Sequence, residues 1–246
     1  MTTAPRSLSP VDPEGLREDR ASRRIESMKI ADHAEWNRLA QAIRRQIEAC
    51  VELDASPEDL RHLADRASAL ADELEAAAPG KRFDLVESGW NGTGSMNYLP
   101  FSPIMGRLNP ASYGLELHQE EQRAVGRVTL RESAEGAVGL AHGGVISGIW
   151  DEVLAAANAI HQTGGPTGSL TIRYRKPTPL YEPLRYVAWV ERVEERKILV
   201  KGECTLRGQV LTSAEGIFIR LRKPGIDWHK HDQKQDPQDS NGVSTE

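Results

Sequence analysis

One apolar helix constrains the fold of this chain more than any other feature of the sequence. The helix opens at Gly143-Gly144, runs to Ile160 and carries two acids, Asp151 and Glu152, in its middle. Apolar residues occupy nearly every face of it, which predicts that other parts of the structure wrap around it. At about sixteen residues the apolar stretch is too short to cross a bilayer. Because an unpaired buried carboxylate is costly, the two acids need a hydrogen-bond partner or an exposed seam.

The composition is typical of a soluble globular protein with one or two domains. The chain has 246 residues, of which 39% are hydrophobic and 27% are charged. A net charge of −5, without a stripe of Lys and Arg, argues against nucleic acid as a partner. Cys50 and Cys204 lie far apart and indicate no disulfide framework, which fits a reducing compartment. Residues 1–20 lack the apolar core of a signal peptide, so we expect a cytoplasmic protein without a membrane span.

The regions that flank this helix differ in character. Residues 1–19 and 223–246 are rich in proline or polar residues and are predicted to be a disordered arm and a disordered tail. Residues 20–80 carry two amphipathic stripes and are predicted to form a helical hairpin, whose second helix begins with Ser56 as N-cap and Pro57 at the first position. The stripe holds no polar constellation, so we interpret the hairpin as a packing arm or a dimer brace.

Residues 81–111 are rich in Gly, Pro, Ser and Asn and are predicted to be an ordered loop segment. Gly92 and Gly94 lack the third glycine and the preceding apolar strand of a dinucleotide-binding turn. The segment also carries four large apolar side chains that we expect to cover apolar surface, namely Trp90, Tyr98, Phe101 and Ile104.

Residues 112–222 alternate apolar and polar residues in six runs, two before the apolar helix and four after it. The predicted order is therefore ββαββββ, in the α+β class. Since no second helix in this region exists to cover the sheet, we expect an antiparallel sheet that curls around the single helix.

The motif around the helix resembles that of a known family. His142-Gly143-Gly144, with Asp151 nine residues after the histidine, resembles the hotdog-fold acyl-CoA thioesterases of the PaaI type. Further matches are Glu135-Gly136, Gly139 and the run from Thr167 through Tyr174-Arg175-Lys176-Pro177 to Leu180. The resemblance covers residues 112 to 221 and implies a hotdog fold that cleaves acyl-CoA to a free acid and coenzyme A. No cofactor is expected apart from the coenzyme A of the substrate.

Geometry predicts that one copy of the helix cannot complete such a site. Thioester hydrolysis needs a donor for the oxyanion and a group that attacks or activates water, both about 3 Å from one carbonyl. The N–H groups of Gly143 and Gly144 suit the first task and Asp151 suits the second. Eight residues of helix separate Gly143 from Asp151 by about 12 Å. A second, antiparallel copy would close that distance, which predicts a homodimer or a homotetramer with two composite sites.

Other candidate residues follow from the resemblance and from their positions. Thr167 matches a position whose hydroxyl holds the attacking water, against the alternative of a loop-ending threonine, and Ser169 is a second candidate for the same role. His142 is either a general base or, more consistent with its place in the turn, the acceptor of a hydrogen bond that shapes the loop. Glu152 competes with Asp151 but projects about 100° away on the helix, so only one of the two is expected to face the site.

Two features leave alternatives open. Arg173, Arg175 and Lys176 would meet the phosphates of coenzyme A or would line a solvated strand face. Related sequences carry an Asn or Gln at the position of Gly136, and that side chain polarises the thioester carbonyl. This chain has no match for it. The histidines show no metal-ligand spacing.

The sequence thus predicts an acyl-CoA thioesterase in which Asp151 is the general base or the nucleophile. Two alternatives remain at this stage. One is a hotdog hydratase or dehydratase, and the other is a non-catalytic protein that binds acyl-CoA or mediates assembly.

Overall fold

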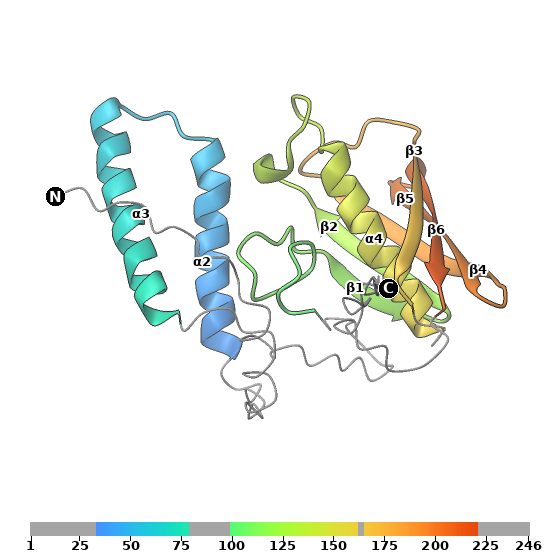
Figure 1. Cartoon of the computed structure of the whole chain (residues 1–246). Coiled ribbons are helices and arrows are strands. Elements are labelled where there is room, and N and C mark those ends of the chain that lie inside the picture. Colours follow the sequence, from blue (N-terminus) through green and yellow to red (C-terminus); the bar gives the residue numbers. More distant parts are fainter. Residues whose placement is uncertain (1–32, 79–98, 162–164, 221–246) are drawn as a thin grey trace, which may run out of the picture.

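The structure, a computed structural model, describes residues 33–78, 99–161 and 165–220. Six strands form one antiparallel sheet in the order β1-β2-β4-β5-β6-β3. The strands are β1 (Glu116–Glu120), β2 (Arg123–Thr129), β3 (Thr167–Tyr174), β4 (Pro183–Val193), β5 (Lys197–Leu206) and β6 (Gln209–Ile219). Helix α4 (Gly143–Ile160) lies between β2 and β3 in the chain and packs on the sheet (Figure 1). The predicted order ββαββββ is confirmed.

Trp150 fixes the rotation of α4 on the sheet. Its side chain is fully buried, its Nε1 donates to Thr212 Oγ1 at 3.0 Å, and its ring meets Tyr186 edge-on with centroids 5.0 Å apart. Gly202 of β5 gives the ring room, because a Cβ there would lie 2.5 Å from it. Asp151 is the next residue on the helix, so its side chain points about 100° around the helix axis from the buried Trp150 side chain.

The described parts of the chain cover α4 on two of its faces and leave the third exposed. The sheet buries the face that carries Ile146, Ile149 and Val153. A second face meets the described part of the loop segment at Gly148, where a Cβ would lie 2.7 Å from Ile104 Cδ1. The third face, which carries Asp151, stays exposed because within the described residues only the edge strand β3 lies beside it.

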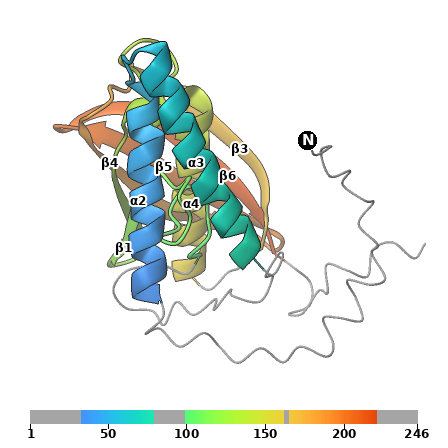
Figure 2. The same cartoon turned by 90° about the vertical axis from the view of Figure 1, so that its left-hand side faces the viewer.

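The predicted hairpin contains two helices, α2 (His33–Val51) and α3 (Pro57–Ala77), that differ in their packing. The Ser56 side chain caps α3 by accepting the Asp59 N–H at 3.2 Å, as predicted. Helix α2 lies between α3 and the sheet (Figures 1 and 2) and buries Ala40 against the rest of the chain. Helix α3 has no buried residue. Within the described residues α2 packs as an arm against the rest of the chain, whereas the alternative of a dimer brace stays a prediction.

The described part of the loop segment covers apolar surface, as predicted. Ile104 packs against the core, and the Phe101 ring meets Trp36 of α2 with centroids 5.2 Å apart. Trp90 and Tyr98 lie outside the described residues, as do the predicted arm (1–19) and tail (223–246). Of the helices that the structure describes, none has the length and apolar character needed to span a membrane.

Candidate active site

The exposed face of α4 carries a hydrogen-bonded acid. Asp151 Oδ1 accepts a hydrogen bond from Thr167 Oγ1 at 2.8 Å. Both residues are exposed, and Thr167 is the first residue of the edge strand β3. The structure thus brings together the two side chains that the sequence proposed as the acid and the holder of the attacking water.

A bulge in β3 decides which hydroxyl reaches Asp151. Thr167 pairs with Phe218 and Ser169 with Ile217, so two steps along β3 oppose one step along β6. A regular strand would place Thr167 and Ser169 on the same face of the sheet. The extra residue, Gly168, places Thr167 on the helix side with buried Phe218, while Ser169 faces away. The structure does not bring Ser169 to Asp151.

The other end of the exposed face is a tightly held turn. His142 is the N-cap of α4, with φ −64° and ψ 136°, and its Nδ1 accepts the Gly144 N–H at 2.9 Å. The His142 N–H in turn donates to Ala134 O at 2.8 Å. His142 therefore makes the loop-shaping hydrogen bond. No acceptor in the described part of the chain binds the Gly143 N–H, which as the first N–H of the helix has no partner within it.

Two side chains that the sequence analysis missed hold the Gly143 peptide. Its carbonyl accepts hydrogen bonds from Ser147 Oγ at 2.8 Å and from Tyr174 Oη at 3.0 Å, and the two hydroxyls lie 3.1 Å apart. Ser147 had a signal in the sequence, because residues 143, 147 and 151 share one helix face. Tyr174 belongs to the run that carries the family resemblance, but nothing in the sequence placed it beside Gly143, because the antiparallel placement of β3 beside α4 brings it there. These contacts fix the direction of the peptide at the start of α4.

Gly136, where related sequences place Asn or Gln, is packed too tightly to carry a side chain. A Cβ at this position would lie 2.8 Å from the Cα of His142. Its neighbour Glu135 is occupied elsewhere, since Glu135 Oε1 accepts the Gly139 N–H at 2.6 Å. Neither Gly136 nor Glu135 therefore supplies a carbonyl-polarising side chain.

Glu152 is directed away from Asp151. It accepts a hydrogen bond from Ser102 Oγ at 2.6 Å, and the same hydroxyl accepts the N–H groups of Ile104 and Met105. Burial raises the pKa of Glu152, an effect that the hydrogen bond from Ser102 opposes. As the helix geometry predicted, only one of the two acids lies on the exposed face. Glu152 instead anchors the loop segment to α4.

Two of the three cationic candidates lie on the other face of the sheet. Arg173 of β3 and Arg175, just beyond the end of β3, flank Tyr174, and they line a shallow cavity of about 160 Å³ with residues of β4, β5 and β6. Arg175 Nε donates to Ser213 Oγ at 3.3 Å. Lys176 follows the strand and is exposed. The chain by itself does not bring these three cations to the Asp151–Thr167 pair.

The arrangement offers two half-sites on one helix. Gly143 and Asp151 both belong to α4, so about 12 Å of helix separates them along the axis. One half supplies a backbone donor at a helix N-terminus, and the other supplies a carboxylate with a bound hydroxyl. Across the described ranges, no three His, Cys, Asp or Glu side chains are placed to hold a metal ion.

Known proteins share this architecture. A model of the thioesterase superfamily matches residues 138–212. A thioesterase superfamily protein of known crystal structure is 33% identical, with a TM-score of 0.66, over 75% of this chain and 90% of that one. The predicted α+β hotdog fold is thereby confirmed.

Two other proteins are similar over less of the chain. Acyl-coenzyme A thioesterase THEM4 of Mus musculus is 30% identical over 113 residues, which are 44% of this chain and 48% of the mouse protein. The match thus spans about half the length of that relative. The E. coli PaaI protein, from the phenylacetic acid degradation operon, is 18% identical over 44% of this chain and 80% of its own, with a TM-score of 0.42.

Proposed function

This chain belongs to the thioesterase superfamily, and on that premise we propose that it hydrolyses acyl-CoA thioesters to a free carboxylic acid and coenzyme A. The observation that carries the proposal is the 2.8 Å hydrogen bond between Thr167 and Asp151 on the exposed face of α4. A similar protein is named an acyl-coenzyme A thioesterase, which supports the substrate class. The two cysteines are free thiols, which supports a reducing, cytoplasmic location.

The chemistry assigns one task to each half-site. Asp151 takes a proton from a water held by Thr167, and the water oxygen attacks the thioester carbonyl carbon. The Gly143 N–H donates to the oxyanion that develops. The C–S bond then breaks, and the coenzyme A thiolate recovers the proton. In the nucleophilic variant Asp151 attacks the carbonyl itself, the thiolate leaves, and water hydrolyses the resulting anhydride.

The active unit in this proposal is a two-fold homodimer, alone or as half of a homotetramer. The 12 Å or so of helix between Gly143 and Asp151 keeps the two groups of one chain from a common carbonyl. In a second copy whose α4 runs antiparallel to that of the first, Gly143 would lie opposite Asp151 of the first copy. The two-fold symmetry would create two such composite sites. The position of β3 at the edge of the sheet supports this, because the Asp151–Thr167 face is open on that side.

An assay of Asp151→Asn tests the function directly. We expect the wild-type protein to release thiol from a panel of acyl-CoAs, and the variant to lose about 10²–10⁴-fold of that rate with its oligomeric state unchanged. Single-turnover hydrolysis in ¹⁸O-water supports the nucleophilic role if Asp151 acquires the label, which happens when water attacks the Asp151 carbonyl of the anhydride. Unchanged turnover in the variant would refute the assignment. Hydration of enoyl-CoA without thiol release, or binding without turnover, would instead support the hydratase or the binding protein.

A further inference from the structure

The His-Gly-Gly turn rests on a short 3-10 helix, η2 (Glu132–Ala134). Ala134, the last residue of η2, is buried and contacts the turn directly. Its carbonyl accepts the His142 N–H at 2.8 Å. His142 then holds the Gly144 N–H through Nδ1. A displacement of η2 therefore moves the backbone donors at the start of α4.

Helix η2 lacks a cap of its own. Its N-cap residue is Arg131, whose side chain makes no capping hydrogen bond. The first N–H groups of a helix have no partner within it and are normally satisfied by the N-cap side chain. The N–H of Ser133, the second residue of η2, is one of these groups.

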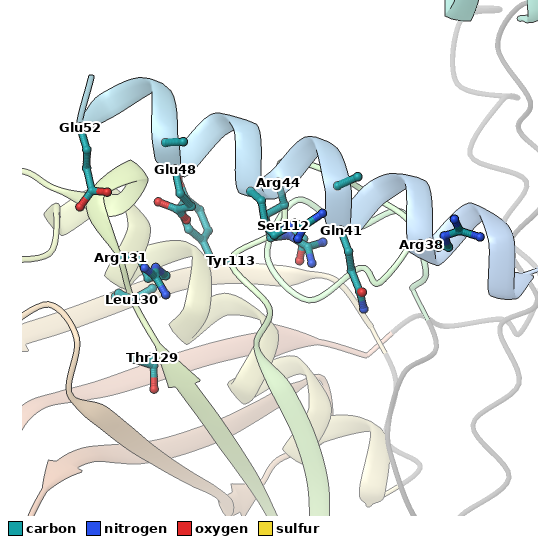
Figure 3. Close-up of a pocket in the computed structure, with 13 residues that line it drawn as sticks. Arg38, Gln41, Arg44, Glu48, Glu52, Ser112, Tyr113, Thr129, Leu130 and Arg131 are labelled. Atoms are coloured by element: carbon teal, nitrogen blue, oxygen red, sulfur yellow. The ribbon is translucent and has the colours of Figure 1, made fainter. Parts of the chain in front are cut away.

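Glu48 of α2 supplies the missing cap from 85 residues away. Its Oε2 accepts the Ser133 N–H at 2.9 Å and its Oε1 accepts the Ser133 Oγ–H at 2.8 Å. Figure 3 shows Glu48 on the side of α2 that faces the sheet domain, beside a cavity of about 750 Å³. Both residues are half-buried. Two charge-assisted bonds from one carboxylate fix the orientation of η2 as well as its position.

A second acid lies close to η2 just beyond the end of α2. The neighbouring Glu132, the first residue of η2, raises the pKa of Glu52, the residue that follows α2. Glu132 also accepts the hydroxyl of Tyr181. The hydrogen bonds that attach α2 to η2 in the described residues are those that Glu48 accepts.

From this sequence of contacts we propose that Glu48 is a positioning residue for thioester hydrolysis, acting through Ser133 and Ala134 on the His-Gly-Gly turn. The inference rests on the proposed function. It gives the helical extension a role in the reaction, since α2 sets where the Gly143 N–H points. Glu48 itself does not touch the reacting atoms. A misplacement of about 1 Å in such a donor can lower a rate by as much as about 100-fold, so even partial loosening of η2 should be measurable.

The test compares three variants with a control on the same helix. Glu48→Ala removes both bonds to Ser133, Ser133→Ala removes one, and Glu48→Gln keeps an acceptor for the N–H and can donate to the hydroxyl. The control is Glu35→Ala, which removes an acid that is 81% exposed and pairs only with Arg38 in the described structure. Thiol-release kinetics and hydrogen exchange of residues 133–147 are measured on the full chain.

We expect Glu48→Ala to lower kcat about tenfold with little change in KM. We also expect it to speed hydrogen exchange in the turn as well as in η2. Ser133→Ala should show a smaller loss, Glu48→Gln should recover most of kcat, and Glu35→Ala should match the wild type. Ser133→Ala and Glu48→Gln keep the test decisive if Glu48→Ala does not fold.

Two outcomes would overturn the inference. In one, Glu48→Ala speeds hydrogen exchange in η2 alone and leaves kcat and hydrogen exchange in the turn unchanged. Glu48 would then only attach α2 to η2 and would not position the turn. A fall in kcat for Glu35→Ala equal to that for Glu48→Ala would trace the effect to α2 as a whole. Failure of the wild type to release thiol would refute the proposed function, whereas the exchange measurements would still report whether Glu48 holds the turn.

Discussion

The two halves of the candidate site are built in opposite ways. The His-Gly-Gly turn is held by η2, by the Nδ1 of His142 and by two hydroxyls on the Gly143 carbonyl. Within the part of the chain that the structure describes, the Asp151–Thr167 pair is held by one hydrogen bond, and both residues are exposed. A backbone donor must be aimed in advance, which needs a rigid frame. In the proposed function the acid acts on one bound water, and we expect a partner subunit and the substrate to displace the remaining water around it.

The largest predicted effect tests whether the two halves meet across two chains. Asp151→Asn removes the acid, and Gly143→Pro removes the donor N–H. Proline is favoured at the first position of a helix, and His142 already has the extended backbone that suits a residue before proline. Each variant alone should lose at least about 100-fold in rate. A heterodimer of the two, purified through two tags, should regain about half of wild-type activity, because one of its composite sites is intact.

Gly143→Ala is the matched control, since it keeps the N–H. A Cβ at this position would lie 3.5 Å from Tyr174 Oη, an ordinary contact, so its activity should stay near that of the wild type. If the heterodimer is as inactive as its parents, both halves of the site belong to one chain and the composite site is wrong.

Gly136→Ala should damage the rigid half alone. The added Cβ would press on the backbone of His142, so we expect a loss of about 1–3 kcal/mol in the free energy of unfolding and a lower kcat. Denaturant titration and thiol release measure the two effects. Val138→Ala, at a residue of the same loop that is 95% exposed, is the control and should change neither. Wild-type stability and activity in Gly136→Ala would show that the turn can shift to accept the added Cβ and is not rigid.

Tyr174→Phe should weaken the turn more gently. It removes one of the two hydroxyls on the Gly143 carbonyl and keeps the ring, so a loss of about 1 kcal/mol, or about fivefold in kcat, is expected. Ser147→Ala added to it should deepen the loss. Thr171→Val, on the opposite face of β3, is the control. Steady-state kinetics measure the effect. An unchanged kcat for the double variant Tyr174→Phe with Ser147→Ala would show that the two hydrogen bonds to the Gly143 carbonyl do not contribute to the rate.

Glu152→Gln should give the smallest effect, visible only in the pH dependence of stability. Burial raises the folded-state pKa of Glu152, so its favourable contribution is present below the unfolded pKa and is lost as pH rises through the folded value. The Tm of the variant minus that of the wild type should therefore increase from pH 4 to pH 8, by about 1–3 °C. A constant difference across this range would contradict a raised pKa.

The order of the strands along the chain and the position of the helix were predictable from the sequence, because both depend on the local pattern of apolar and polar residues. Alternation along each strand and the apolar run from Val145 to Ile160 are visible within single segments. The 16-residue spacing of Asp151 and Thr167 was recognisable as well, through the family resemblance. The separation of Thr167 from Ser169 was not, since it depends on a bulge that exists only when β3 pairs with β6.

The sequence by itself determined that a short helix carries a glycine turn at one end and an acid eight residues later, and from this spacing it predicted that one copy cannot close the site. Tertiary structure decided what holds each group. Tyr174 reaches Gly143 because β3 runs back along α4, and Glu48 reaches Ser133 across 85 residues because α2 packs on η2. Such contacts follow from how distant segments pack together, and no periodicity within either segment encodes them.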